Sequence, residues 1–166
     1  TLVAALEAKP DYIEFSNSGM LTLSNPQWVR DFCVPALKKA TALCRQAGIP
    51  SELHCCGKQW LVLELCEKET ELDSVNPLQP PPMGDCDLAE CKRRFGKRFC
   101  LKGNVGVTEP MLMGTADEVE KDVLRCFASA KDGGGYILFT EEGLGANTPF
   151  ENIRRYVEVG KREGVY

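Results

Sequence analysis

Short apolar runs alternate with longer amphipathic segments along this chain, and that alternation limits its fold more than any other feature. Strands are expected at residues 11–15, 49–55, 72–78, 98–105 and 133–140. Helices are expected at residues 24–48, 58–69, 86–97, 115–132 and 149–164. A strand and the helix after it repeat at roughly 30 residues, which is the length of a βαβ crossover unit. The pattern predicts an α/β fold of about five βα units with a parallel sheet.

The first long helical segment, residues 24–48, has the clearest helical period. Its recurring apolar residues are Trp28, Phe32, Leu37, Ala40 and Leu43. Pro35 is expected to kink this helix or to mark a restart, because proline lacks the backbone N–H that the preceding turn would use. A later helix is expected to begin at Thr115, which has the spacing of a capping box with Glu118.

Two parallel architectures are compatible with this alternation. A doubly wound sheet usually carries a glycine-rich phosphate loop between its first strand and the following helix. Here GNVGV is not followed directly by a helix and GGGY precedes a strand, so both match that loop poorly. A closed (β/α)8 barrel needs about 250 residues. This chain has 166 residues and about five βα units, which are too few to close such a barrel.

The composition narrows the class of function. The formal net charge is −4 and the sequence pI about 5.2, whereas nucleic-acid binding normally needs a basic face. The short basic cluster at residues 92–98 is interpreted as a solvated helix face. The chain has no run of about 18 apolar residues, and its first residues do not resemble a signal peptide. We therefore expect no nucleic-acid partner and no membrane span, and the missing initiator methionine suggests a fragment or a processed chain.

The chain contains nine cysteines, scattered along its periodic segments. A disulfide framework is typical of small, loop-rich secreted domains, so we expect free thiols in a reducing compartment, the cytoplasm. Five thiols are expected to pack in the core: Cys33, Cys44, Cys66, Cys100 and Cys126. Cys86 and Cys91 lie five apart around a helix start, a spacing that is not expected to place them on one face.

Polar residues follow every expected strand. They are Ser16, Asn17, Ser18, His54, Cys55, Cys56, Asn76, Asp85, Asp87, Asn104, Glu141 and Glu142. In parallel α/β architectures the loops after the strands carry function, and the carboxyl ends of the strands meet at one edge. We therefore expect these residues to converge on one face, although asparagine and serine also serve as turn and cap residues.

His54 is the only histidine and stands two residues before Cys56, at the end of an expected strand. Because side chains alternate along a strand, His54 and Cys56 should point to one side and Cys55 to the other, into the core. Imidazole nitrogen and thiolate sulfur are both zinc ligands, and a catalytic zinc uses three protein ligands with one open position. The spacing is also compatible with a buried cysteine beside a hydrogen-bonded histidine.

Several longer stretches occur in a characteristic order. They are DYIEF followed by NPQWVRDFCVPALKKA, SELHCCGKQ, DLAECKRRFGKRFCLKGNV, GTADEVEKDV, and GGGYILF followed by NTPFENIRRYVEVGKREG. Together they resemble the uroporphyrinogen decarboxylase superfamily, in its cobalamin- and thiol-dependent methyltransferase branch. The resemblance implies that residues 1–166 are a single domain with the N-terminal units absent. That domain would be the C-terminal portion of a TIM (β/α)8 barrel, about strands four to eight.

The resemblance also implies a zinc site. In the methyltransferase branch an H-x-C pair supplies two ligands, which match His54 and Cys56, and a cysteine after the last strand supplies the third. That third position falls on Glu142 here, with Glu141 as a neighbouring alternative, and a carboxylate oxygen also binds zinc. The remaining candidates are, for catalysis, Glu142 and Asn104 and, for cofactor contact, Asn17, Asn76 and Asp85.

The activity implied by the resemblance is zinc-dependent methyl transfer between a corrinoid, as methylcobalamin, and a small-molecule thiol. A separate corrinoid protein would be the partner. The first alternative is cofactor-free decarboxylation of a tetrapyrrole, whose branch typically lacks H-x-C-G and has a histidine near position 142. The second alternative is a non-catalytic relative, or a half-barrel fragment whose exposed strand edges pair with a second copy in a homodimer.

Overall fold

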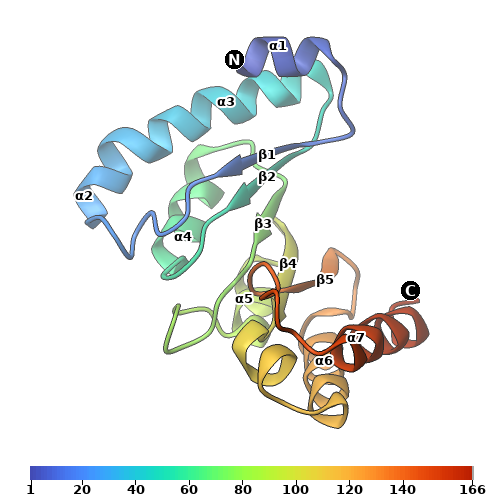
Figure 1. Cartoon of the computed structure of the whole chain (residues 1–166). Coiled ribbons are helices and arrows are strands. Elements are labelled where there is room, and N and C mark those ends of the chain that lie inside the picture. Colours follow the sequence, from blue (N-terminus) through green and yellow to red (C-terminus); the bar gives the residue numbers. More distant parts are fainter. Residues whose placement is uncertain (166) are drawn as a thin grey trace.

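The computed structural model describes residues 1–165, in which five parallel strands form one sheet (Figure 1). The strands are β1 Ile13–Ser16, β2 Ser51–His54, β3 Ser74–Asn76, β4 Cys100–Val105 and β5 Tyr136–Thr140. Each strand pairs with its neighbours in the sequence, so the spatial order is β1-β2-β3-β4-β5. The expected parallel sheet of βα units is therefore confirmed.

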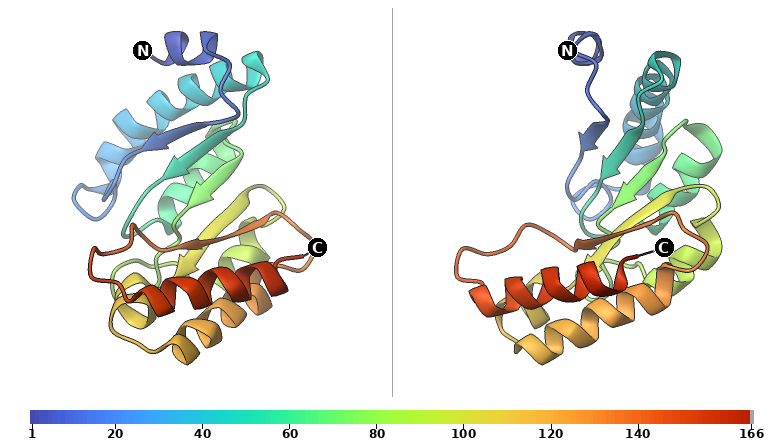
Figure 2. Two further views of the ribbon diagram at one scale, coloured as in Figure 1. Left: turned by 45° about the vertical axis from the view of Figure 1, so that its right-hand side comes forward. Right: turned by 90° about the vertical axis from the view of Figure 1, so that its right-hand side faces the viewer.

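Helices follow each strand and line one side of the twisted sheet (Figure 2). The longer ones are α3 Val34–Ala47, α4 Trp60–Glu69, α5 Leu88–Phe95, α6 Ala116–Ala130 and α7 Phe150–Glu163. Within residues 1–165, no helix combines the length and the apolar character that crossing a membrane requires. The outward strand positions Leu53, Val75 and Leu101 are fully buried beneath these helices.

The segment between β1 and β2 contains three consecutive helical elements where one kinked helix is expected. They are α2 Pro26–Trp28, the π-helical η1 Val29–Cys33, and α3, which has Pro35 in its first turn. Pro35 thus follows the junction between the π-helical turn and α3, where a kink or restart is expected, while the backbone of Cys33 and Val34 stays helical.

The buried face of this segment differs from the expected one. Trp28, Phe32 and Leu43 are 61%, 63% and 40% exposed. Leu37 is buried as expected, and the other side chains that face the core are Val29, Val34, Thr41 and Cys44. The π-helical turn accounts for the difference, since it contains one more residue per hydrogen-bonded turn and rotates the following face. A strict 3.6-residue period is wrong across such a turn.

Two helical elements lie outside the expected ones. The short helix α1 Leu2–Glu7 precedes β1, and the element η2 Val107–Leu112 occupies the segment expected to be a loop after β4. Glu109 has an extended backbone inside η2, which separates two helical turns. The residue before a proline avoids the helical region, and Pro110 follows Glu109. The extended Glu109 therefore interrupts η2, and the sequence of this segment shows no continuous helical pattern.

Other local expectations are met at the start of α6. The Thr115 hydroxyl accepts the N–H of Glu118, and the Glu118 carboxylate accepts the N–H of Thr115 at 2.7 Å, which completes the capping box. All nine cysteines lie within residues 1–165 and have free thiols, with no disulfide among them. Cys44, Cys66 and Cys126 are buried as expected.

The remaining cysteines correct the sequence-based expectations. Cys33 and Cys100 are only half-buried: Cys33 packs at the rim of the core, whereas Cys100 lies on the sheet face opposite the helices, near Ser74 and Lys102. Cys86 and Cys91 do meet: both are fully buried, and a hydrogen bond between their thiols, followed by burial, raises the pKa of Cys86. The loop before α5 folds back, as the hydrogen bond from Cys86 N to the Gln79 carbonyl shows. That path brings the two thiols together.

The sheet face opposite the helices carries a polar network. Lys102 Nζ donates to Glu52 Oε1 at 2.7 Å and lies 3.9 Å from Glu14 Oε2. Ser74 Oγ donates to the other oxygen of Glu52 at 2.7 Å. These residues come from four adjacent strands, β1 to β4, at positions that alternate with the apolar ones. This polar face runs along the strands toward their carboxyl ends.

Candidate metal centre

Three side chains converge at the carboxyl end of the sheet. His54 is the last residue of β2, Cys56 follows it by two residues, and Glu142 follows the last residue of β5 by two. Parallel pairing brings the two strand ends to one edge, so Cys56 meets Glu142 across 86 residues of sequence.

The distances between their polar atoms are short. His54 Nε2 lies 2.9 Å from Cys56 Sγ and 3.5 Å from Glu142 Oε1, and Cys56 Sγ contacts Glu142 Oε1 directly. The three potential ligand atoms all lie within 4.8 Å of one another. Cys55 points the other way into the core, fully buried, and burial raises its pKa to about 12. That thiol stays neutral, as a packing residue should.

A second layer of contacts holds His54. Asn76, the last residue of β3, is fully buried, and its Oδ1 lies 2.6 Å from His54 Nδ1. The Nδ2 of Asn76 donates to Glu14 Oε2 at 3.3 Å. The Nδ1 of His54 is thus engaged on the side away from Cys56, and Nε2 faces the thiol and the carboxylate.

This order of thiol, imidazole and amide also occurs around nucleophilic cysteines. A nucleophile needs a lowered thiol pKa. Here burial and the hydrogen bond with Glu142 raise the pKa of Cys56, although a hydrogen bond with Ser18 opposes them. A carboxylate against the thiol favours a cation between them over a free nucleophile, because a bound metal deprotonates a coordinating thiol.

The donor set fits zinc. A tetrahedral zinc with one sulfur, one nitrogen and one oxygen ligand places the donor atoms about 3.3–3.6 Å apart. The 3.5 Å between His54 Nε2 and Glu142 Oε1 lies in this range. Cys56 Sγ lies 2.9 Å from His54 Nε2 and closer still to Glu142 Oε1, so the thiol would have to move away from both to share a metal with them. Three donors leave the fourth position open, as in catalytic zinc sites.

The other sequence-predicted candidates take part in different contacts. Asp85 Oδ1 accepts the backbone N–H groups of Gln59 and Trp60 at the start of α4. Asn104 is 1% exposed, and its Nδ2 donates to the Leu78 carbonyl at 2.7 Å. Asn17 Nδ2 lies 3.7 Å from Cys33 Sγ on the loop after β1.

Glu141 is turned away from the three-residue cluster. Its Oε1 accepts the N–H of Val107 at 3.1 Å, at the start of η2. Burial raises the pKa of this carboxyl, and the hydrogen bond with Val107 opposes that rise. Of the two neighbouring glutamates, Glu142 is therefore the one that reaches His54 and Cys56.

Three residues that support the site went unpredicted. Gln79 Oε1 accepts the N–H of Gly57 at 2.6 Å, and Thr22 Oγ1 accepts the N–H of Lys58 at 2.8 Å, so both hold the loop that carries Cys56. Glu14 supports Asn76. The lone glutamate in the apolar run DYIEF was the available signal for Glu14, whereas Gln79 and Thr22 have no local signal.

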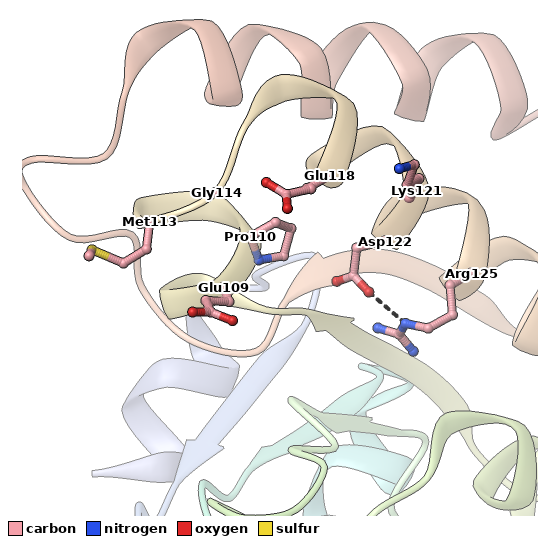
Figure 3. A pocket seen from close by; sticks show the side chains of 8 residues that line it. All are labelled: Glu109, Pro110, Met113, Gly114, Glu118, Lys121, Asp122 and Arg125. Carbon is pink, nitrogen blue, oxygen red and sulfur yellow. Dashed lines mark hydrogen bonds and ion pairs between the residues drawn. The ribbon is translucent and has the colours of Figure 1, made fainter.

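Besides a hollow of about 700 Å³ lined by Asn104, Arg125 and Glu141, two further hollows flank the carboxyl end of the sheet. One, of about 340 Å³, opens beside Cys56 and Glu142 and includes the apolar side chains Leu23 and Met83. The second, of about 470 Å³, lies between η2 and α6 (Figure 3). In it the ion pair of Asp122 and Arg125 faces Glu109, and none of the three cluster residues lines it. Only the first hollow gives access to the cluster.

Comparison with known proteins identifies the family. The sequence profile of the uroporphyrinogen decarboxylase (URO-D) family matches residues 1–163. The chain belongs to the uroporphyrinogen decarboxylase family. The resemblance inferred from the sequence motifs is thereby confirmed.

Two curated relatives represent different activities. A methylated-thiol–coenzyme M methyltransferase from Methanosarcina mazei is 26% identical over 144 residues, which is 87% of this chain and 35% of that protein. A uroporphyrinogen decarboxylase from Synechocystis sp. is 24% identical over 141 residues, 83% of this chain and 37% of that protein. The chain thus spans about a third of the length of these curated relatives.

Solved structures show the fold. A methyltransferase from Methanosarcina mazei superposes with a TM-score of 0.78 at 20% identity, over 99% of this chain and 45% of that one. A B12-independent methionine synthase from Shewanella sp. superposes with a TM-score of 0.63 at 16% identity, over 97% of this chain and 52% of that one. The family member described here is accordingly a portion of a (β/α)8 barrel, as expected.

Proposed function

We propose that this family member contributes the metal site of a zinc-dependent methyltransferase. The enzyme would move a methyl group between a corrinoid, as methylcobalamin, and a small-molecule thiol. The observation that carries the proposal is the convergence of His54, Cys56 and Glu142 on one point beside an accessible hollow. The Methanosarcina relative, named for transfer between a methylated thiol and coenzyme M, supports it.

The residues of the site have distinct roles in this proposal. His54, Cys56 and Glu142 hold the metal and leave one position open for the substrate sulfur. When bound, zinc supplies the Lewis acidity that keeps a thiol deprotonated near neutral pH. Leu23 and Met83, both largely exposed, give the neighbouring hollow an apolar surface for the substrate to contact.

The size of the methyl donor is the reason to expect a partner protein. In such a transfer the substrate sulfur would form a bond to the methyl carbon, and the cobalt–carbon bond of methylcobalamin would break with its electron pair left on cobalt. A corrinoid is far larger than the hollow of about 340 Å³, so it would approach from outside the barrel mouth. A separate corrinoid-carrying protein is therefore the partner we propose.

Decarboxylation of a tetrapyrrole is the second candidate function. Two relatives named uroporphyrinogen decarboxylase favour it, and the one from Methylobacillus flagellatus is 31% identical over 71 residues, 43% of this chain. That reaction requires cationic groups that receive several carboxylates. The loop after β5 instead presents Glu141 and Glu142, and the only histidine lies on β2. These residues favour methyl transfer.

Metal content tests the first proposal directly. Protein purified without a histidine tag or chelator is analysed by elemental mass spectrometry, with circular dichroism as a check of folding. We expect about one zinc per chain in the unaltered protein, and loss of it in His54→Ala, Cys56→Ser and Glu142→Ala.

The matched control is Cys100→Ser, which removes a half-buried thiol on the polar sheet face. It should keep its zinc. A folded protein without zinc would overturn the proposal, as would zinc that survives all three ligand substitutions.

A further inference from the structure

We infer that Asn76 is a positioning residue, held by Glu14, that sets the tautomer of His54. In the tautomer it selects, Nδ1 carries the proton and Nε2 offers its lone pair toward Cys56 and Glu142. The inference rests on the proposed function only for its effect on zinc affinity. Its effect on the imidazole belongs to the metal-free protein.

The geometry of β2 and β3 places Asn76 behind His54. The two residues are register partners in the parallel sheet, so their side chains leave the same face side by side. Asn76 Oδ1 lies 2.6 Å from His54 Nδ1, and Asn76 is fully buried. Water therefore cannot reach the amide to displace it, and Asn76 Oδ1 is the hydrogen-bond partner of His54 Nδ1.

Glu14 decides which way the amide of Asn76 faces. A carboxylate accepts hydrogen bonds, so the group that approaches Glu14 Oε2 at 3.3 Å must be the Nδ2 donor of Asn76. The carbonyl oxygen of the amide then faces His54. Because that oxygen can only accept, the imidazole nitrogen opposite it must carry the proton. The chain of contacts from Glu14 to His54 thus has a single consistent assignment.

Lys102 and Glu52 anchor the far end of this chain. Lys102 Nζ lies 3.9 Å from Glu14 Oε2 and 2.7 Å from Glu52 Oε1. Its ammonium group lies on the side of Glu14 away from His54, within the same polar network. The polar sheet face therefore supports the metal centre through four strands, from Lys102 on β4 to His54 on β2.

The expected consequence is a prepared metal ligand. A free neutral imidazole populates mainly the tautomer protonated on Nε2, which cannot bind a metal through that nitrogen. Partners that hold the other nitrogen of a metal-binding histidine typically change metal affinity 10- to 100-fold, so we expect about that loss when Asn76 is removed.

The single histidine makes the tautomer directly measurable. In tag-free, metal-free protein labelled with ¹⁵N, the imidazole spectrum contains signals from His54 alone. At alkaline pH, where an imidazole is ordinarily neutral, we expect the tautomer protonated on Nδ1. Asn76→Leu should shift the population to the tautomer protonated on Nε2. An unaltered protein protonated on Nε2, or a tautomer that Asn76→Leu leaves unchanged, would overturn the inference.

Two substitutions of Glu14 keep the test valid if Asn76→Leu folds poorly. The Glu14 side chain is 38% exposed, so its replacement disturbs the core little. Glu14→Leu should release the amide and mix the tautomers, whereas Glu14→Gln can still accept from Asn76 and should restore the preference. A mixed population in Glu14→Gln together with an unmixed one in Glu14→Leu would contradict the assignment.

A buried asparagine elsewhere provides the matched control for zinc affinity. Asn152 on α7 is 3% exposed and donates to the carbonyls of Met111 and Gly114. In competition with a chelator, Asn76→Leu should weaken zinc binding about 10- to 100-fold, and Asn152→Leu should not weaken it. Equal zinc affinity in both variants and the unaltered protein would overturn the inference and leave the proposed function standing. A protein that binds no zinc but shows the Asn76-dependent tautomer would overturn the proposed function and support the inference.

Discussion

Asp85 shows how residues at strand ends divide between ligand contacts and support of the backbone. Its position in the loop after β3 favours a ligand contact, yet its carboxylate accepts the N–H of Gln59 at 2.7 Å and of Trp60 at 3.0 Å. The first N–H groups of a helix have no partner within it, and the start of α4 obtains one from 25 residues away. No local pattern indicates that distant cap.

Replacement of Asp85 is predicted to weaken the fold at α4. Asp85→Ala should lower the free energy of unfolding by about 1–2 kcal/mol, as for loss of a helix cap, measured by urea denaturation. Asp85→Asn should retain part of the stability because its amide oxygen still accepts. Asp11→Ala, at an exposed position before β1, is the control. An Asp85→Ala curve that matches this control would contradict the capping role.

At the scale of single elements, local signals were reliable where a helix end is capped by its own residues. Thr115 and Glu118 are three residues apart and form both bonds of the capping box of α6. The signals were less reliable between β1 and β2, where η1 shifts the buried face from Trp28 and Phe32 to Val29 and Val34. The register of a helical face depends on every turn before it, so one wide turn is enough to displace it.

The capping box leads to a prediction confined to α6. Thr115→Ala should lower the free energy of unfolding by about 1 kcal/mol, because the N–H of Glu118 loses its acceptor. Thr115→Ser keeps the hydroxyl and should stay close to the unaltered protein. Urea denaturation of the three proteins measures the effect, and equal loss in both variants would show that the hydroxyl is not responsible.

At the scale of the whole molecule, the polar network on the inner sheet face connects four strands. Burial opposes ionisation of Glu52, but hydrogen bonds from Lys102 and Ser74 outweigh it and hold the pKa of Glu52 below its usual value. A carboxylate with a lowered pKa in the folded state stabilises that state above its unfolded pKa. This stabilisation is lost as the pH falls from about 4.3 through the lower, folded pKa.

The free energy of unfolding should therefore depend on the ion pair of Glu52 and Lys102 and on the pH. Lys102→Met leaves Glu52, 4% exposed, without its cation and should cost about 3 kcal/mol of unfolding free energy. In the unaltered protein the free energy of unfolding should decrease below about pH 4.3, and Glu52→Gln should show a shallower decrease. Urea denaturation across pH 3–7 measures both, and identical pH profiles would contradict the role of Glu52.

The two outermost strands of the sheet, β1 and β5, affect self-association of the chain. Among residues 1–165, β1 and β5 each have one neighbour in the sheet, so each presents a free edge. Free parallel edges pair readily with further strands. We predict that the isolated chain self-associates, with a mass by light scattering of about twice 18.4 kDa at tens of micromolar. A monomeric mass over the whole concentration range would contradict this.

The sequence by itself determined the alternation of strands and helices, the capping box of α6 and, through the family resemblance, the grouping of His54, Cys56 and Glu142. Periodicity and helix caps depend on neighbouring residues, so they can be recognised in the sequence alone. Only the tertiary structure decided that Asn76 stands behind His54 and that Cys86 meets Cys91. Those contacts depend on strand register and loop paths, which arise from packing of the whole chain and leave no spacing in the sequence.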